Sequence, residues 1–361
     1  MDTIINKIQY TTNTVPLQVV TACLNAHGDD YQGTLKANFS SNVWHEADNT
    51  DLYDHLSTIL PKTMRYPESE AQSLKTALAE KYALKPSQFS VGNGSIDIIY
   101  RIAQAFSGKK SLIVFPTFSE YSKACTVNNH TIQLCYRENL SISIDIHQPN
   151  LVWLCNPNNP DGYCFDRKEL QILFYTYPQV TFIIDQSFID FSLQEALAPT
   201  SILEFSNLIL IHSLTKRYTI PGLRIGYVIA SESIIGQLDQ YKIPWSVNTL
   251  AIEAGKYIMK CKEDSFNLKA WLEERNRLQE AINKIGLFKT IPSQTPFFLV
   301  TLLNGKAPDL KAFLLKEDIL IRVATDFDNN GIEMIRLNTL SPVQNDLLID
   351  KLNRWKQSLS R

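Results

Sequence analysis

Short, wholly apolar segments alternate with helical patterns along this 361-residue chain, and that alternation restricts its fold more than any other feature. Helical patterns occur at 71–82, where Ala71, Leu74 and Leu78 share one face, and at 96–105. The apolar segments lack the polar positions of a half-exposed strand, so they are typical of strands buried on both faces. They lie at 112–115, 151–155, 181–184, 208–211 and 225–230. The alternation predicts an α/β fold, with a mostly parallel central sheet covered by helices on both faces.

The C-terminal third has a different pattern, which predicts a small α+β domain. A long amphipathic helix with Leu268 and Trp271 on its apolar face ends at Gly286, a residue typical of helix ends. Strand-like segments follow, with one helix between them and another at the end; they lie at 297–302, 319–323 and 334–337. Because the first 40 or so residues are polar and irregular, we expect an N-terminal arm. The predicted division is an arm with part of the small domain (1–45), a large domain (46–250) and a small C-terminal domain (251–361).

The overall composition excludes several classes of protein. Apolar residues make up 44% of the chain, enough for a large and a smaller domain. The net charge is −2 with both signs interspersed, which argues against a nucleic-acid partner. The six cysteines are scattered without metal-ligand spacing and are expected to be reduced and mostly buried. No segment has the pattern of a secretion signal or a membrane span, so we expect a soluble, cytoplasmic protein.

Three of the apolar segments end in clusters of polar residues. The turn 156–162 follows one segment, Asp185 ends another, and Ser213 to Lys216 follow a third. Parallel sheets bind their ligands at the carboxyl ends of the strands. We therefore expect these residues to form one ligand site.

Lys216 points to the chemistry of that site. A lysine amine can condense with a carbonyl group, and pyridoxal 5′-phosphate is the commonest carbonyl cofactor that uses one. Ser213 and Thr215 precede Lys216, and Arg224 follows in a Pro-Gly turn, so donors for a phosphate are close in sequence. Taken alone, Lys216 would be interpreted as an exposed loop lysine.

Other residues fit a phosphorylated aromatic cofactor. The turn 92–95 precedes an apolar helix, so Gly94 and Ser95 form either an anion site or an ordinary N-cap at Ser95. Asp185 could pair with a protonated pyridine nitrogen or cap a turn. Asn159 could bind the ring's 3-oxygen or simply form a turn. Phe118 could stack on the ring or belong to the core.

Two arginines, Arg322 and Arg336, lie in apolar strands of the predicted small domain. A buried guanidinium is costly unless it is paired. Each could therefore bind a substrate carboxylate or phosphate, or form a salt bridge with a nearby acidic residue.

These motifs together resemble the fold-type I pyridoxal 5′-phosphate enzymes. The resemblance rests on Ser213-x-x-Lys216 with Arg224 eight residues later, Asn159-Pro160-x-Gly162, Asp185 and the turn 92–95. It covers the chain from about residue 37 to near the C-terminus. The similar branch contains histidinol-phosphate aminotransferases and threonine-phosphate decarboxylases.

The resemblance implies a role for each candidate residue. Lys216 would bind the cofactor aldehyde and move the proton, with Asp185 on the pyridine nitrogen as the second catalytic residue. Arg336 would bind the substrate carboxylate and Arg322 the substrate phosphate. Tyr66 would reach the cofactor phosphate of a neighbouring subunit, which implies a homodimer. The remaining cofactor contacts would be Gly94, Ser95, Ser213 and Arg224 on the phosphate, Asn159 on the 3-oxygen and Phe118 on the ring.

Within the branch, three features resemble the decarboxylases. They are Trp245 within 243–251, Phe188 where aminotransferases have a tyrosine, and an N-terminal stretch that places His27 and Asn42 near the substrate. The implied reaction converts O-phospho-L-threonine to (R)-1-aminopropan-2-yl phosphate for cobalamin biosynthesis. The alternatives are a histidinol-phosphate or related aminotransferase using 2-oxoglutarate and glutamate, and a non-catalytic regulator or scaffold. The chain departs from the family pattern at Gln186, at 44–45 and at 295–297; the last two concern substrate contacts.

Overall fold

A computed structural model describes residues 31, 33–260, 266–324 and 331–359. The larger body is built on a seven-stranded sheet in the order β2-β8-β7-β6-β5-β3-β4, and only β8 runs antiparallel to the others. The strands of this sheet are β2 (Phe89–Gly92), β3 (Lys110–Phe115), β4 (Thr131–Tyr136), β5 (Leu151–Cys155), β6 (Thr181–Asp185), β7 (Leu208–Ser213) and β8 (Gly226–Ile229). The prediction of a mostly parallel α/β sheet is confirmed.

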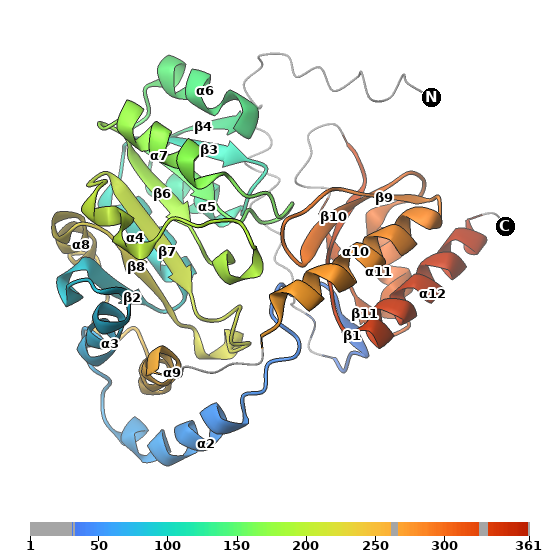
Figure 1. The fold of residues 1–361 in the computed structure, drawn as a ribbon, viewed down its shortest axis with the longest axis horizontal. Helices are drawn as coiled ribbons and strands as arrows, with labels where there is room; N and C mark the ends of the chain where they lie inside the picture. Colours follow the sequence, from blue (N-terminus) through green and yellow to red (C-terminus); the bar gives the residue numbers. More distant parts are fainter. Residues whose placement is uncertain (1–30, 32, 261–265, 325–330, 360–361) are drawn as a thin grey trace.

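Helices cover both faces of this sheet, and each face has its own core (Figure 1). One core contains Ile98, Ala124 and Leu238, from α4 (Ser95–Ala105), α5 (Glu120–Val127) and α8 (Glu232–Asp239). The other core is formed by α2 (Thr50–Ile59), α3 (Gln72–Tyr82), α6 (Leu140–His147), α7 (Arg167–Thr176) and α9 (Thr249–Lys260). Because α9 packs on α3, the core of the large domain extends past residue 250.

Two strands of the large sheet were not predicted from the sequence. β4 lies at the edge of the sheet, where its first three residues remain partly or fully exposed and break the apolar pattern. β2 has only four residues, one of which is the buried Ser90. Pairing with β8 and β3, which the sequence pattern does not show, makes β2 and β4 strands.

A four-stranded antiparallel sheet, in the order β12-β13-β10-β9, forms the smaller body. Its strands are β9 (Phe288–Thr290), β10 (Phe297–Leu302), β12 (Arg322–Val323) and β13 (Met334–Asn338). Apolar residues of three helices pack with it into a further core; these are α10 (Leu268–Lys284), α11 (Ala307–Leu315) and α12 (Pro342–Ser358).

The predicted strand at 319–323 is wrong as a single element, because the chain changes sheets within it. β11 (Ile319–Leu320) pairs in parallel with β1 (Ala37–Asn38), whereas Arg322 and Val323 pair with β13. The pairing of β1 with β11 attaches the beginning of the described chain to the small body (Figure 1).

The predicted end of the long amphipathic helix is confirmed. The Asn267 side chain accepts a hydrogen bond from the Ala270 N–H (3.1 Å) and caps the start of α10. Gly286 follows the other end with φ +77°, a backbone conformation that favours glycine.

Candidate active site

The carboxyl ends of the central strands surround a cavity of about 140 Å³. Six of its lining residues were predicted from the sequence to bind a cofactor: Ser95, Phe118, Asn159, Asp185, Lys216 and Arg224. The other residues on its wall are Ile96, Tyr121, Cys155, Ser187, Phe188 and Thr215. The structure therefore brings together residues that are up to 129 positions apart in the sequence (224 − 95).

Asp185 is the last residue of β6, and its carboxylate lies buried in the wall of this cavity. The Tyr121 hydroxyl donates to Oδ2 (2.7 Å), and the Ser187 N–H donates to Oδ1 (2.9 Å). Burial nevertheless raises the pKa of Asp185 above its ordinary value. A cation at this position would stabilise the charged carboxylate, so the site fits a protonated pyridine nitrogen.

Tyr121 is a site residue that the sequence analysis missed. It lies in the first turn of α5, and its ring is 5.8 Å from that of Phe118 in an edge-to-face arrangement. The only signal available was its spacing of three residues from Phe118, which places both near the start of one helix.

Lys216 follows the end of β7 and lies beside an aromatic wall. Its Nζ is 5.9 Å from the centre of the Phe188 ring, and its backbone carbonyl accepts from the Trp44 N–H (3.1 Å). Just before it, the Ser213 and Thr215 hydroxyls are 2.8 Å apart and hydrogen-bonded. Lys216 is therefore held by its backbone, with two hydroxyl groups next to it in the sequence.

The start of α4 and Arg224 together form a cradle suited to an anion. Gly94, with φ +82°, is the N-cap of this helix, so an ordinary N-cap at Ser95 is not what the structure shows. A Cβ at Gly94 would lie 2.3 Å from Nη2 of Arg224, and one at Gly226 would lie 2.7 Å from the Ser95 nitrogen. The two glycines thus let a guanidinium and the first helical N–H groups approach one ligand, which fits a phosphate.

Arg336 connects the cofactor cavity to the small body. This arginine on β13 is 9% exposed; its Nη1 donates to Asn159 Oδ1 (2.6 Å) and its Nη2 to the Ser40 carbonyl (2.5 Å). Because Oδ1 of Asn159 is occupied in this way, its NH₂ group is left to donate to an oxygen in the cavity. Arg322 on β12 is the register partner of Arg336 and is 8% exposed, so two buried arginines stand opposite each other on neighbouring strands.

Asn42 is a buried amide in the segment that follows β1. It is 5% exposed, and neither its Oδ1 nor its Nδ2 has a hydrogen-bond partner. The backbone around it is held firmly, because Asn338 donates to the carbonyls of Ser41 and Val43 (3.0 Å each). A buried amide with both atoms unsatisfied is costly, which suggests that a ligand completes its hydrogen bonds. The other predicted residue of this stretch, His27, lies outside the described residues.

The chain departs from the family pattern at 44–45 and 295–297, and both segments contribute a residue that packs around Phe188 in the cavity wall. Trp44 and Phe297 belong to one buried cluster with Phe188, whose ring is 4.9 Å from that of Phe297. Burial lowers the pKa of His45, which follows Trp44. One residue at each of these two departures therefore packs in the cluster with Phe188, and none of the departing residues is a predicted cofactor contact.

Tyr66 does not line the cavity of its own chain. Its side chain is 84% exposed, and its ring lies 5.2 Å from that of Trp245, which is also exposed. Its predicted contact with the cofactor of a neighbouring subunit remains a prediction.

The class of protein follows from comparison with known families. Residues 34–352 match the model for the aminotransferase class I and II family, and the chain belongs to that family. It is an enzyme of the pyridoxal 5′-phosphate-dependent class, and pyridoxal 5′-phosphate is its cofactor. Asp185, Lys216 and the cradle at Gly94 and Arg224 fit the pyridine, aldehyde and phosphate groups of this molecule.

Individual relatives divide between two activities. The chain is 32% identical to a histidinol-phosphate aminotransferase of Thermoanaerobacter sp. (strain X514), over 80% of this chain and 83% of the relative. It is 30% identical to a putative threonine-phosphate decarboxylase of Caldanaerobacter subterraneus, covering 80% and 82%. Among solved structures, the L-threonine-O-3-phosphate decarboxylase of Porphyromonas gingivalis superposes with a TM-score of 0.86 at 35% identity, over 89% and 99% of the two chains. In the part of the chain that the structure describes, we find no helix able to cross a membrane.

Proposed function

We propose that this protein is a threonine-phosphate decarboxylase, which converts O-phospho-L-threonine to (R)-1-aminopropan-2-yl phosphate and CO₂ for cobalamin biosynthesis. The observation that carries the proposal is the pair of buried arginines, Arg322 and Arg336, on neighbouring strands, together with the buried amide of Asn42, which has no hydrogen-bond partner. A substrate with both a carboxylate and a phosphate offers anionic groups that two arginines can bind and acceptors for this amide.

The wall around Lys216 supports decarboxylation in particular. Phe188 lies where the aminotransferases of this branch have a tyrosine, so the cavity has one hydroxyl fewer near the cofactor. The likeness to the Porphyromonas gingivalis decarboxylase, at 35% identity and 89% coverage, supports the same interpretation.

When bound, pyridoxal 5′-phosphate supplies a carbonyl carbon that an amine can attack and a ring that withdraws electrons from the substrate α-carbon. Asp185 would keep the pyridine nitrogen protonated, and Asn159 would donate to the ring oxygen. Arg336 would bind the substrate carboxylate and hold it in one orientation, so that the bond to be broken is fixed before CO₂ leaves. Lys216 would then give a proton to the α-carbon.

A second candidate is histidinol-phosphate aminotransferase, because the 32% identical Thermoanaerobacter relative carries that name. The same residues would serve that reaction, with Lys216 removing a proton from the α-carbon instead. This reaction needs a keto acid as amino-group acceptor, which a decarboxylase does not.

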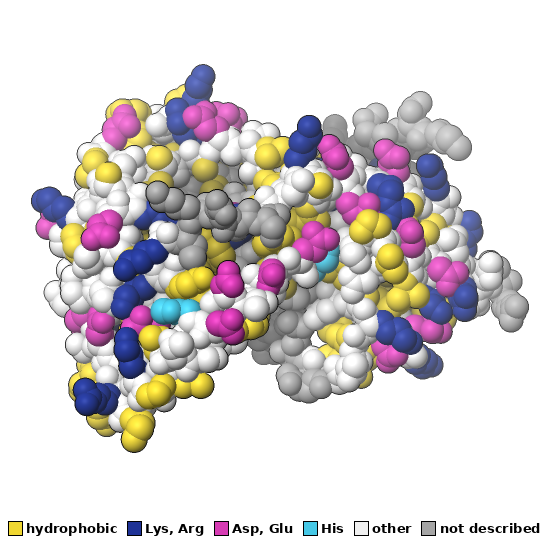
Figure 2. All heavy atoms as spheres, turned by 60° about the horizontal axis from the view of Figure 1, so that its bottom comes forward, with side chains coloured by type: hydrophobic (Ala, Val, Ile, Leu, Met, Phe, Trp, Pro, Cys, Tyr) yellow, Lys and Arg dark blue, Asp and Glu magenta, His cyan; other side chains and the backbone are white. Residues whose placement is uncertain are grey.

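We also propose that the active protein is a homodimer in which Tyr66 reaches the neighbouring site. Large apolar side chains are exposed near it: Leu60, Met64, Ile243 and Trp245. Figure 2 turns the end that carries α2 forward and shows hydrophobic side chains at its lower edge beside lysine and arginine side chains. An exposed apolar patch of this kind is typical of a subunit interface.

The test incubates purified protein and pyridoxal 5′-phosphate with O-phospho-L-threonine in the absence of a keto acid and measures CO₂. We expect stoichiometric CO₂ and aminopropanol phosphate, and loss of both in Lys216→Ala. A parallel reaction contains histidinol phosphate and 2-oxoglutarate. Turnover only in this second reaction would refute the decarboxylase and establish the aminotransferase.

A further inference from the structure

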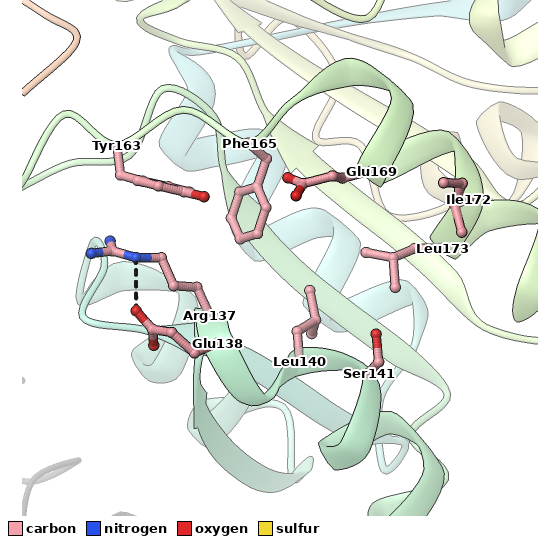
Figure 3. A pocket seen from close by; sticks show the side chains of 9 residues that line it. All are labelled: Arg137, Glu138, Leu140, Ser141, Tyr163, Phe165, Glu169, Ile172 and Leu173. Atoms are coloured by element: carbon pink, nitrogen blue, oxygen red, sulfur yellow. Dashed lines mark ion pairs between the residues drawn. The ribbon is translucent and has the colours of Figure 1, made fainter. Parts of the chain in front are cut away.

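A second cavity, of about 640 Å³, opens between α6 and α7 (Figure 3). One wall comes from the short helix η5 (Arg137–Asn139) and α6, the other from α7, and Tyr163 and Phe165 of the intervening loop form the end (Figure 3). Its volume lies in the range of pockets that hold small organic ligands. The lining residues are Arg137, Glu138, Leu140, Ser141, Tyr163, Phe165, Glu169, Ile172 and Leu173.

The lining combines an apolar floor with an excess of negative charge. Leu140, Phe165 and Leu173 are buried below it. Among the described lining residues Arg137 is the one cation; it binds Glu138 (Nε to Oε1, 3.2 Å) and, behind the wall, the buried Asp161 (Nη1 to Oδ2, 2.6 Å), while Glu169 stands on the opposite wall. The lining thus carries one cation and two carboxylates, which favours a positively charged ligand.

The aromatic end of the cavity favours the same kind of ligand. Arg137 already lies over the Tyr163 ring, with its Cζ 4.2 Å from the ring centre. Phe165 is edge-to-face with Tyr163 at 5.2 Å, so a ligand meets two aromatic rings. Cations bind the faces of aromatic rings, and an apolar body would cover the floor.

This cavity is connected to the cofactor site through one set of hydrogen bonds. Asp161, which pairs with Arg137, accepts from Asn158 Nδ2 (2.7 Å), and Asn158 in turn bonds to Thr117 and to the Pro116 carbonyl (2.8 Å each). Asn159 and Phe118, which line the cofactor cavity, are the next residues along these two loops. A small cavity that includes Arg137, Cys155 and Asn158 lies between the two sites.

We infer that the α6–α7 cavity binds a small organic cation with an aromatic or branched apolar body, and that the bound cation loosens the hold on the cofactor. A cation over the Tyr163 ring repels the Arg137 guanidinium and competes with it for Glu138. Arg137 then loses part of its contact with Asp161, which positions the loop that carries Asn159. This inference concerns binding and cofactor retention and holds for either proposed reaction.

The binding test titrates the cofactor-loaded enzyme with benzyltrimethylammonium by calorimetry. This quaternary ion cannot condense with the cofactor aldehyde. Its neutral analogue of similar shape, 2-methyl-1-phenylpropan-2-ol, should bind about tenfold more weakly. Glu169→Gln keeps the helix cap that Glu169 makes and should weaken cation binding about fivefold, whereas Glu280→Gln, on the exposed face of α10, should leave it unchanged.

Ser141→Trp, at an exposed position on the cavity wall, should block binding while the cofactor stays bound. Three results would each overturn the assignment of this cavity as a cation site. They are no binding of benzyltrimethylammonium, equally tight binding of the neutral analogue, and cation binding that Glu169→Gln and Ser141→Trp leave unchanged.

The connection is tested by the rate at which the cofactor leaves the enzyme. Saturating benzyltrimethylammonium should speed this release about fivefold, a typical size for coupling between sites. In Asp161→Asn the ion pair with Arg137 is lost, so the cation should still bind but change the release rate little. If the cation binds to the unmodified protein but leaves the rate of cofactor release unchanged, the connection between the two cavities is refuted. Only the cation-binding site would then remain.

Discussion

Replacing Asp185 with asparagine should have opposite effects on the cofactor-free and cofactor-bound protein. Without a cofactor, Asp185 is a buried carboxylate whose pKa is raised by burial, even though Tyr121 and Ser187 donate to it. Asparagine keeps the shape and the acceptor for Ser187, and removes the charge. With the cofactor bound, the same substitution removes the partner of the pyridine nitrogen.

The two effects can be estimated from the contacts. Hydrogen bonds to a charged group contribute about 1.5–3 kcal/mol each, and the raised pKa shows that burial outweighs these two bonds. We expect Asp185→Asn to stabilise the cofactor-free protein by about 1–2 kcal/mol, or roughly 1–3 °C in melting temperature. Loss of the buried ion pair should weaken cofactor binding by about 3 kcal/mol, roughly 150-fold.

The pH dependence has a definite sign. Because the folded pKa of Asp185 lies above its unfolded value, stability is lost as the pH rises from the unfolded pKa through the folded one. The cofactor-free variant does not lose stability in this way. The difference in the free energy of unfolding between the variant and the unmodified protein should therefore shrink as the pH is lowered toward 4.

The assay combines thermal unfolding of both proteins, with and without cofactor, and equilibrium titration with pyridoxal 5′-phosphate. Tyr121→Phe is the matched control: it keeps the carboxylate and removes one donor, so it should destabilise the cofactor-free protein. If Asp185→Asn lowers the melting temperature equally with and without cofactor, Asp185 is a structural residue and the reasoning fails.

Three further substitutions test the substrate side and the interface. Arg336→Met should raise the KM for the amino-acid substrate about 100-fold while the cofactor absorbance persists; an unchanged KM would refute its assigned role. Asn42→Leu removes a buried amide without partners, so the substrate-free protein should be as stable as before or more stable, while KM rises at least about tenfold; a clear loss of thermal stability would mean that the amide is structural. Tyr66→Phe should speed cofactor loss severalfold in a dimer, and an unchanged loss rate would argue against its contact across the interface.

The sequence predicted the part of the site that lies directly after the strands. Asn159, Asp185 and Lys216 follow wholly apolar segments, and the carboxyl ends of parallel strands meet at one edge, so their meeting could be foreseen. Tyr121 and Asp161 could not, because their contacts depend on how α5 and the loop after β5 pack. Asp161 is moreover indistinguishable in sequence from an ordinary turn aspartate.

The change of sheet between Leu320 and Arg322 shows the same limit. An apolar run of five residues fits a single buried strand, and nothing in its pattern shows that Ile319 and Leu320 pair with β1 while Arg322 pairs with β13. Only the pairing register shows that Arg322 stands opposite Arg336 on one face of the small sheet. The cost of each arginine in an apolar strand left a substrate group and a salt bridge both open, and the family resemblance implied the substrate role, whereas their proximity came from the fold.

The hydrogen bond between Arg336 and Asn159 connects the arginine proposed to bind the substrate with the amide proposed to bind the cofactor. In the absence of substrate, Arg336 holds Oδ1 of Asn159 at 2.6 Å and thereby fixes which way the amide faces. A substrate carboxylate that binds Arg336 would meet a guanidinium that already donates to the Asn159 oxygen and to the Ser40 carbonyl. If Arg336 binds the substrate carboxylate as proposed, the same guanidinium would contact the substrate and the Asn159 amide. An arginine can make these contacts through separate nitrogens held in one planar group, whereas a lysine would bring every acceptor to a single nitrogen.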